Sequence, residues 1–273
     1  MRYPWGRNVL VTGVSSGIGK ASALLLASRG FHVWGVARHS GDLPSSIHFH
    51  SLDVTNEQDT EKTIAEIDKE AVKETGDHLS LLLCCAGMGI AGSAEQAPIA
   101  DVRRQFEVNY FGTVIVCKYA MPFLRQNRRS RVLLTSSVGG RIPLPFQSQY
   151  ASTKFAIEAY GEALRMEASR YHVAVTLIEP GDTKTSFTKE RTTVEPKESP
   201  YYTQAMAAVQ KIAHDEQTGD SPEKVAHCIL SLATKNHAPV RKAIGWDSKL
   251  EMFLIRILPA SFVEAMLKKI YLC

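Results

Sequence analysis

The chain has 273 residues, of which 44% are hydrophobic and 22% charged, as in an ordinary globular protein with one large α/β domain or two small ones. The formal net charge is +4, from 32 basic and 28 acidic side chains. Because this charge is small and dispersed, we expect no nucleic-acid partner, and we interpret the densest basic cluster, Arg125 to Arg131, as a solvated loop.

The first six residues carry no apolar run of signal-peptide length. The five cysteines are odd in number, lie mostly in apolar runs and show no metal-ligand spacing. We therefore expect a cytoplasmic protein without a metal site. We find no internal repeat.

The first predicted unit is a strand over residues 8–12, a glycine turn over 13–19 and a helix to about residue 29. Glycines let main-chain N–H groups approach a pyrophosphate, whose charge the helix N-terminus stabilises. The turn predicts a dinucleotide site. Its expected contacts are Gly13, Ser15, Ser16, Gly17, Ile18 and Gly19.

A second strand over residues 31–37 ends in Arg38, where an acidic residue would otherwise hold the ribose 2′-hydroxyl. An arginine there suits a 2′-phosphate, so we expect NADP(H) as the cofactor in preference to NAD(H). The alternative is an exposed loop arginine. A third strand over residues 47–52 ends at Asp53 and Val54, at the sheet edge where ligands bind.

A capping box at Thr55 to Gln58 predicts a helix from there to about residue 74. The apolar run 80–85 is typical of a strand buried on both faces. It ends in Cys85, and Ala86-Gly87 then lets the chain pass close to a cofactor. Two helical patterns follow, over residues 97–108 and 110–126, with the polar Asn109 between them.

A buried strand over residues 131–135 ends in Ser136-Ser137, and a long helix over 148–171 carries Tyr150 and Lys154. Residues at i and i+4 share one helix face. A cation beside a phenol lowers the phenol pKa, so Tyr150 is a candidate general acid or base.

The next strand spans residues 173–178, and Pro180, Gly181, Thr183 and Thr185 follow at its carboxyl end. Residues 186–200 are charged and lack a clear period, which predicts a mobile loop or lid. Helix signals resume after Pro200 and at Ser221-Pro222, and residues 237–243 are a candidate last strand. Strands that alternate with helices predict a parallel sheet covered on both faces.

Over residues 7–245 the chain resembles the short-chain dehydrogenase/reductase family. The shared motifs are Thr12-Gly13-x-x-x-Gly17-x-Gly19, Asp53, Ala86-Gly87, Asn109, Ser137, Tyr150-x-x-x-Lys154 and Pro180-Gly181, in that family's order and spacing. The resemblance implies a Rossmann-type, doubly wound α/β fold with about seven parallel strands in the order 3-2-1-4-5-6-7.

By this resemblance, Tyr150 exchanges a proton with the substrate oxygen, and Ser137 hydrogen-bonds the same oxygen. Lys154 is implied to lower the pKa of Tyr150 and to bind the nicotinamide ribose. Asn109 is implied to hold a water that links Lys154 to solvent, and Thr183 and Thr185 to hold the carboxamide. The implied reaction is hydride transfer between the cofactor and a secondary alcohol or ketone.

The chain departs from the family pattern at Cys84-Cys85, where the family has two asparagines. The cofactor contact there is mainly through the backbone, so we expect binding to persist. Ser136 is a rival to Ser137, but the thirteen-residue spacing to Tyr150 favours Ser137.

The predicted domain comprises residues 1–246, and a helical extension follows over 247–273, in which a capping box at Ser261 to Glu264 predicts the start of a second short helix. The apolar segments of the extension are too short to span a membrane. Three interpretations stay open: a helix pair packed on the core or on a dimer mate, a cover for a lipophilic site, or a contact with a membrane surface. We expect a homodimer or homotetramer.

This tail resembles family members that act on hydroxysteroids and other lipophilic alcohols, which predicts a lipophilic alcohol or ketone as the substrate, with a hydroxysteroid preferred. An apolar cleft would hold it. The candidate lining residues are Ile90, Ile142, Leu144, Pro145 and Phe146. The alternatives are a reductase of 3-oxoacyl thioesters, small ketones or sugars, and a non-catalytic NADP(H)-binding regulator.

Overall fold

Within residues 5–272, which the computed structural model describes, seven parallel strands form one sheet in the order β3-β2-β1-β4-β6-β7-β9. The short strands β5 and β8 pair separately. The strand bounds are β1 Asn8–Thr12, β2 His32–Ala37, β3 Ile47–Ser51, β4 Leu81–Cys84, β5 Ile90–Ala91, β6 Ser130–Thr135, β7 Val173–Pro180, β8 Thr192–Thr193 and β9 Arg241–Ile244. The main sheet therefore confirms the predicted order.

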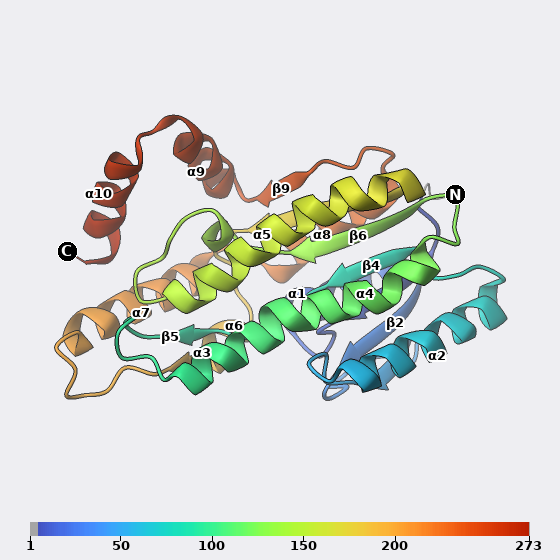
Figure 1. Ribbon diagram of the computed structural model, residues 1–273, viewed down its shortest axis with the longest axis horizontal. Coiled ribbons are helices and arrows are strands. Elements are labelled where there is room, and N and C mark those ends of the chain that lie inside the picture. Colours follow the sequence, from blue (N-terminus) through green and yellow to red (C-terminus); the bar gives the residue numbers. More distant parts are fainter. Residues whose placement is uncertain (1–4, 273) are drawn as a thin grey trace.

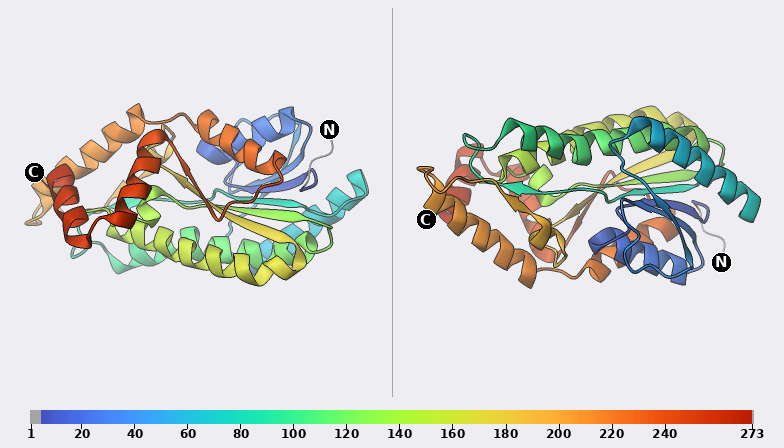
Figure 2. Two further views of the ribbon diagram at one scale, coloured as in Figure 1. Left: turned by 90° about the horizontal axis from the view of Figure 1, so that it is seen from above. Right: turned by 90° about the horizontal axis from the view of Figure 1, so that it is seen from below.

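Helices cover both faces of this sheet, with α2, α4 and α5 on one face and α1 and α8 on the other (Figures 1 and 2). The helix bounds are α1 Gly17–Ser28, α2 Glu57–Thr75, α3 Ile99–Phe106, α4 Gly112–Leu124, α5 Ser148–Ala168, α6 Phe187–Glu190, α7 Tyr202–Thr218, α8 Pro222–Thr234, α9 Trp246–Ile257 and α10 Ala260–Tyr271. Two 3₁₀ turns, η2 Val138–Gly140 and η3 Ser169–Tyr171, and one π-helical segment, η1 Glu107–Phe111, complete the set.

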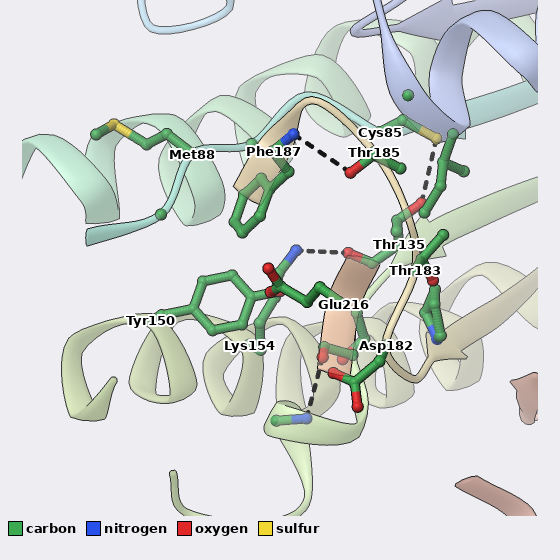
Figure 3. A pocket seen from close by; sticks show the side chains of 18 of the residues that line it. Cys85, Met88, Thr135, Tyr150, Lys154, Asp182, Thr183, Thr185, Phe187 and Glu216 are labelled. Atoms are coloured by element: carbon green, nitrogen blue, oxygen red, sulfur yellow. Dashed lines mark hydrogen bonds between the residues drawn. The ribbon is translucent and has the colours of Figure 1, made fainter. Parts of the chain in front are cut away.

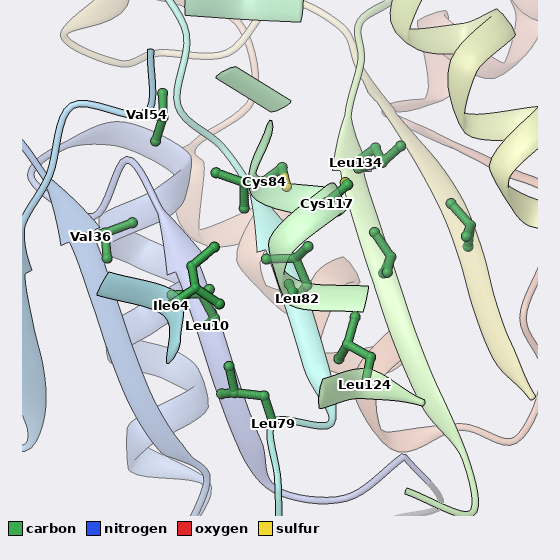
Figure 4. Packing of buried hydrophobic residues seen from close by; sticks show 14 of the residues in the cluster. Leu10, Val36, Val54, Ile64, Leu79, Leu82, Cys84, Cys117, Leu124 and Leu134 are labelled. Carbon is green, nitrogen blue, oxygen red and sulfur yellow. The ribbon is translucent and has the colours of Figure 1, made fainter. Parts of the chain in front are cut away.

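The central strands are apolar on both sides because both of their faces are covered. Successive side chains of a strand point to opposite faces, so Leu82 and Cys84 of β4 pack under α2 and α4, while Leu81 and Leu83 pack under α1 and α8. Figure 4 shows the first of these two layers. Its Cys84 lies beside Cys117 of α4, and both are buried free thiols.

Several helix ends differ from prediction. Asn56, and not Thr55, caps α2, because its side chain accepts a hydrogen bond from the Asp59 N–H at 3.2 Å. Helix α10 begins at Ala260, after Pro259, so Ser261 lies inside the helix and is not its cap. Ser221 caps α8 as predicted.

Two further predictions are corrected by packing. Arg131 is not part of a solvated loop: it is fully buried, its guanidinium bonds the carbonyl groups of Leu232 and His237, and Trp5 stacks on it. The segment 186–200 is irregular only in part: it forms the short helix α6 and then β8, which pairs in parallel with β5, while residues 194–200 are loop and turn.

The tail follows β9 directly, since α9 begins at Trp246, next to the predicted boundary. The parallel strands point toward the end of the molecule where α7, α9 and α10 lie (Figure 1). Residues 1–4 and 273 of the predicted domain and extension lie outside the described residues.

Candidate active site

A cleft of about 1190 Å³ opens at the carboxyl ends of the parallel strands. All of the residues predicted to contact a cofactor line it: Gly13, Ser15, Ser16, Gly17, Ile18, Gly19, Arg38, Asp53, Val54, Cys85, Ala86, Gly87, Tyr150, Lys154, Pro180, Gly181, Thr183 and Thr185. Their individual roles stay predictions, but the fold brings them together from six segments of the chain.

The turn after β1 is packed so tightly that only glycine fits at two positions. Gly13 has φ of 73°, and a side chain there would lie 2.9 Å from the Ala86 nitrogen. A side chain at Gly19 would lie 2.1 Å from the Gly13 carbonyl oxygen. The backbone at the start of α1 is therefore bare, as the approach of a pyrophosphate requires.

The Cys85-Ala86 segment is fixed to β1 and β6 through hydroxyl groups. The Thr12 hydroxyl accepts hydrogen bonds from the N–H groups of Cys85 and Ala86, both at 3.1 Å. The Cys85 thiol lies 3.3 Å from the Thr135 hydroxyl. These contacts hold the segment in place in a chain that lacks the family's asparagines there.

Arg38 and Asp53 line the cleft just after the carboxyl ends of β2 and β3. Arg38 is exposed, and its carbonyl accepts a hydrogen bond from the Ser51 hydroxyl at 3.2 Å. One carboxylate oxygen of Asp53 accepts from both the N–H and the hydroxyl of Thr55. The guanidinium is thus available for a phosphate at the position that the sequence predicted.

The catalytic candidates lie at the inner part of the same cleft. Lys154 is buried on α5, and its ammonium donates to the Thr135 carbonyl at 2.9 Å (Figure 3). Burial lowers the pKa of Lys154 to about 8. The ring of Phe187, from α6, covers Tyr150 with 5.7 Å between ring centres.

Burial raises the pKa of Tyr150 to about 12, and the nearby side chain of Ser137 offsets only part of that effect. The predicted lowering by Lys154 is therefore wrong for this structure. Desolvation of the phenol is the largest effect on its pKa, and Lys154 is not among the groups that shift it.

Ser137 and Ser136 are now distinguished by their contacts. Ser137 lies close enough to Tyr150 to lower the pKa of the phenol, and its oxygen accepts a hydrogen bond from the Gly139 N–H at 3.0 Å. The Ser136 hydroxyl is buried without a hydrogen-bond partner among the described residues. This geometry favours Ser137.

Asn109 does not line the cleft but supports one of its walls from η1. Its amide accepts from the Met88 N–H at 2.8 Å and donates to the Met88 carbonyl and to the Thr153 hydroxyl. The amide oxygen and the amide nitrogen of Asn109 are thus both hydrogen-bonded to the protein. The predicted water that links Lys154 to solvent through Asn109 stays a prediction. The two predicted helices around Asn109 are joined through η1 without a break.

The apolar lining is partly different from prediction. Ile142 and Leu144 line the cleft, but Ile90, Pro145 and Phe146 do not. Ile90 is instead buried in β5, where it packs as core. The apolar residues that sequence reasoning missed come from other segments: Met88, Phe187, Ile212, Trp246, Leu267, Ile270 and Tyr271.

Carboxylates also line the outer part of the cleft, and no motif indicated them. They are Asp182, Glu190, Asp215, Glu216, Asp220, Asp247 and Glu251. Burial, followed by the charges of Asp215 and Glu216, raises the pKa of Asp182 to about 6. Desolvation, followed by the charges of Asp182 and Asp247, likewise raises the pKa of Glu251, whose side chain reaches solvent. Three members of the group are paired with cations, Asp215 with Lys211, Glu216 with Arg191 and Asp220 with Lys224. Asp182 and Glu251 have no such pair among the described residues, and their charges repel each other.

No group of three or more His, Cys, Asp or Glu side chains among residues 5–272 is arranged to hold a metal ion. The cleft instead combines a bare glycine turn, a tyrosine next to a serine and a lysine, and an outer part that is apolar and acidic. Such a site can hold a dinucleotide and transfer a proton to or from a substrate oxygen.

Comparison with known proteins agrees with this geometry. A family model described as short chain dehydrogenase matches residues 7–196. The chain is 33% identical over 239 residues to a 3-ketodihydrosphingosine reductase of Bacteroides thetaiotaomicron, with 87% of each chain covered. It is 35% identical over 190 residues to an NADPH-dependent 3-dehydrocapnine reductase of Ornithobacterium rhinotracheale, with 66% of each covered.

The fold is also found among solved structures. A short-chain dehydrogenase from Streptomyces avermitilis superposes with a TM-score of 0.80 at 25% identity, and 97% of this chain and 96% of that one are covered. The similarity extends through nearly the whole chain, beyond the part that the family model matches.

Proposed function

The chain belongs to the short-chain dehydrogenase family, and on this premise we propose that it uses NADPH to reduce the ketone group of a long-chain, lipophilic substrate. The observation that carries the proposal is the single cleft in which Tyr150, Ser137 and Lys154 lie between the glycine turn and an apolar outer wall. One relative is named as NADPH-dependent, which supports this cofactor.

The cofactor, when bound, supplies the hydride. The bare backbone of the glycine turn would hold its pyrophosphate, and Arg38 its 2′-phosphate. Lys154, whose pKa of about 8 leaves it charged at neutral pH, would bind hydroxyl groups at the inner end.

Tyr150 acts as the general acid in this proposal. With a pKa of about 12 it holds its proton at neutral pH, and a substrate oxygen that gains negative charge on reduction takes that proton. Ser137, which lies close to Tyr150, orients the same oxygen. This assignment favours reduction as the working direction.

The outer part of the cleft supports a substrate class more specific than a lipophilic ketone. Apolar side chains from α7, α9 and α10 suit an alkyl chain, and the mutually repelling carboxylates of Asp182 and Glu251 suit a cationic group. The substrate of one relative, 3-ketodihydrosphingosine, is a long-chain ketone with an amino group. We take a long-chain amino ketone as the proposed substrate, with a steroid ketone as the competing one.

The experiment is NADPH consumption with four ketones: 3-ketodihydrosphingosine, a chain-matched ketone without the amino group, a 3-ketosteroid and a small polar ketone. We expect kcat/KM to be highest for the first. A preference for the steroid would restore the hydroxysteroid prediction. A preference for the small ketone, or for a 3-oxoacyl thioester added to the panel, would refute the lipophilic substrate. NADPH binding without any turnover would indicate a non-catalytic regulator.

The amino-group contact is tested separately with Asp182→Asn and Glu251→Gln. Each should lower kcat/KM for the amino ketone by roughly tenfold to 100-fold, as expected for the loss of an interaction with a charged group. Neither should change kcat/KM for the matched ketone without the amine. An equal loss for both ketones would show that these carboxylates act on folding and not on the amine.

A further inference from the structure

The outward face of α9 carries a row of large apolar side chains exposed to solvent. Trp246, Leu250, Phe253 and Ile257 are 76%, 48%, 60% and 61% exposed, and their spacing of four, three and four residues places them on one helix face. Ser248 lies on the opposite side of the helix and is buried. The row therefore faces solvent, and Trp246 at its start also reaches the lining of the cleft.

Helix α10 repeats this arrangement. Phe262 and Met266 are exposed and four residues apart, while Leu267 and Tyr271 of the same helix turn toward the cleft. We define the tail face as Trp246, Leu250, Phe253, Ile257, Phe262 and Met266. Figure 2 shows that the two helices lie together at the end of the molecule that the strands point to.

Most of the side chains that border the tail face are basic. Lys249 and Arg256 lie four residues before and three residues after Phe253, and Lys269 lies three residues after Met266. All three are exposed. Of the acidic residues of these helices, Asp247 and Glu251 lie on the side of α9 that lines the cleft, and Glu264 pairs with Lys268. Asp247 is also exposed three residues before Leu250, so the border of the tail face holds three basic side chains and one acidic one. Exposed apolar rows with cationic borders complement an anionic lipid surface.

The dimensions of the tail face exclude a membrane span and are small for a second copy of the chain. Each helix has 12 residues and is therefore about 18 Å long, short of the roughly 30 Å of a bilayer core. No helix within residues 5–272 is long and apolar enough to cross a bilayer. At 1.5 Å per residue the α9 row is about 17 Å long and the α10 row about 6 Å, so with a width of about 10 Å they cover about 230 Å², less than a third of the ~800 Å² that each partner buries in a stable interface.

We propose that the tail face docks on the surface of an anionic lipid bilayer, with α9 and α10 lying in the headgroup region. Trp246 belongs to both the tail face and the lining of the cleft, so the docked surface is continuous with the site. A lipophilic ketone would pass from the bilayer into the cleft without crossing water. Docking itself does not depend on the proposed function, whereas this route for the substrate rests on it.

Docking is tested by co-sedimentation of the full chain with vesicles of phosphatidylcholine alone and of phosphatidylcholine with phosphatidylserine. We expect binding that is stronger with phosphatidylserine. The double variant Phe253→Ser/Ile257→Ser should weaken it more than roughly tenfold, and Arg256→Gln about fivefold. Met166→Ser is the matched control, because Met166 is an apolar side chain 71% exposed on α5, away from the tail.

The same variants separate docking from catalysis. With a small water-soluble ketone, all of them should keep wild-type kcat/KM, whereas with a long-chain ketone embedded in vesicles the double variant should lose activity in parallel with its vesicle binding. Wild-type chain that stays in the supernatant with both vesicle types would overturn the proposal. So would a wild-type dimer, measured by light scattering, that the double variant dissociates without any change in vesicle binding.

Discussion

At the scale of single residues, the site depends on two titratable groups with opposite shifts. Burial raises the pKa of Tyr150 to about 12 and lowers that of Lys154 to about 8. Both groups therefore favour their uncharged forms more than they would in water. The phenol therefore carries its proton at neutral pH, as a general acid must, although the raised pKa makes it a weaker acid than a free phenol.

Replacement of Tyr150 by phenylalanine removes the proton and leaves the ring that packs against Phe187. We expect kcat to fall by about 10²- to 10⁴-fold, the usual size of general acid catalysis, with the Kd for NADPH nearly unchanged. Stopped-flow turnover and a fluorescence titration measure the two quantities. Tyr160→Phe, on the same helix but in the core beside Tyr110, should behave as wild type. Near-wild-type turnover of Tyr150→Phe would reject the assignment.

Arg38 is the residue on which the predicted cofactor preference depends. Arg38→Asp should lower kcat/KM with NADPH by roughly 10- to 100-fold, because a charge-assisted pair with the 2′-phosphate is replaced by repulsion. It should raise kcat/KM with NADH, since a carboxylate can accept from the ribose hydroxyl. Arg38→Ala should lose the NADPH preference without a gain for NADH. Equal efficiency of the wild type with both cofactors would contradict the prediction.

At the scale of elements, the π-helical segment η1 connects the helical layer to the cleft. The Asn109 side chain hydrogen-bonds the N–H and the carbonyl of Met88, in the segment after β4, and the Thr153 hydroxyl of α5. A regular α-helix from α3 to α4 would turn this side chain elsewhere. The segment thus positions Met88, which lines the cleft.

Asn109→Ala should lower the free energy of unfolding by about 2–4 kcal/mol, because it leaves buried partners unsatisfied. It should also lower kcat, as Met88 loses its support. Asn127→Ala is the matched control: the Asn127 amide likewise donates to a backbone carbonyl, that of Leu79, at the far end of β4. Urea unfolding and turnover measure both variants. Loss of activity in Asn127→Ala as well would make the effect one of general stability.

Strand β7 carries a buried carboxylate, Glu179, next to the cleft residue Pro180. Glu179 lies 3.5 Å from Arg141 and 3.4 Å from Arg241, yet burial and the charge of Glu158 raise its pKa from 4.5 to about 7. Because the folded-state pKa is above the unfolded one, protonation of Glu179 stabilises the folded state at low pH. That contribution is lost as the pH rises through about 7.

Glu179→Gln does not titrate, so its stability relative to the wild type should rise as the pH increases from about 4.5 to about 7. The urea midpoints of the two proteins, compared at both ends of this range, provide the measurement. A difference between the midpoints that stays constant with pH, or that moves in favour of the wild type, would contradict the raised pKa.

At the scale of the whole molecule, the cleft is closed by segments that are distant in the chain. The α6 residue Phe187 covers Tyr150, while Trp246, Leu267 and Tyr271 come from the tail. Of the three interpretations of the tail, a cover for the site is the one that these contacts favour, because the inner side of the tail lines the cleft. Its outer side is the apolar face for which we propose a lipid surface.

A chain that ends at Gly245 should raise KM for long-chain ketones roughly tenfold or more, since apolar burial contributes about 25 cal/mol per Å². The kcat/KM for a small ketone should stay near that of the full chain. If the shortened chain does not fold, Leu267→Ser within the full chain tests the same lining residue. Unchanged KM for both sizes of ketone would show that the tail does not cover the substrate.

The residues of the sequence determined where the strands lie, that their sheet is parallel, and which segments line the cofactor cleft, whereas the order of the strands followed from the resemblance to the family. The first three depend on local signals: apolar runs mark buried strands, glycines mark a turn that side chains would block, and the carboxyl ends of parallel strands meet at one edge. The predicted cofactor residues, from Gly13 to Thr185, accordingly share one cleft.

Only the tertiary structure decided which remote segments meet at the cleft and how burial and neighbouring charges shift the pKa of each group in it. The pKa of Tyr150 depends on its burial, to which the Phe187 ring contributes. Arg131 can be buried because its guanidinium bonds the carbonyl groups of Leu232 and His237. The carboxylates that line the cleft come from helices that carry no motif. Desolvation and charge coupling act through space between residues far apart in the chain, and for that reason no local pattern in the sequence encodes them.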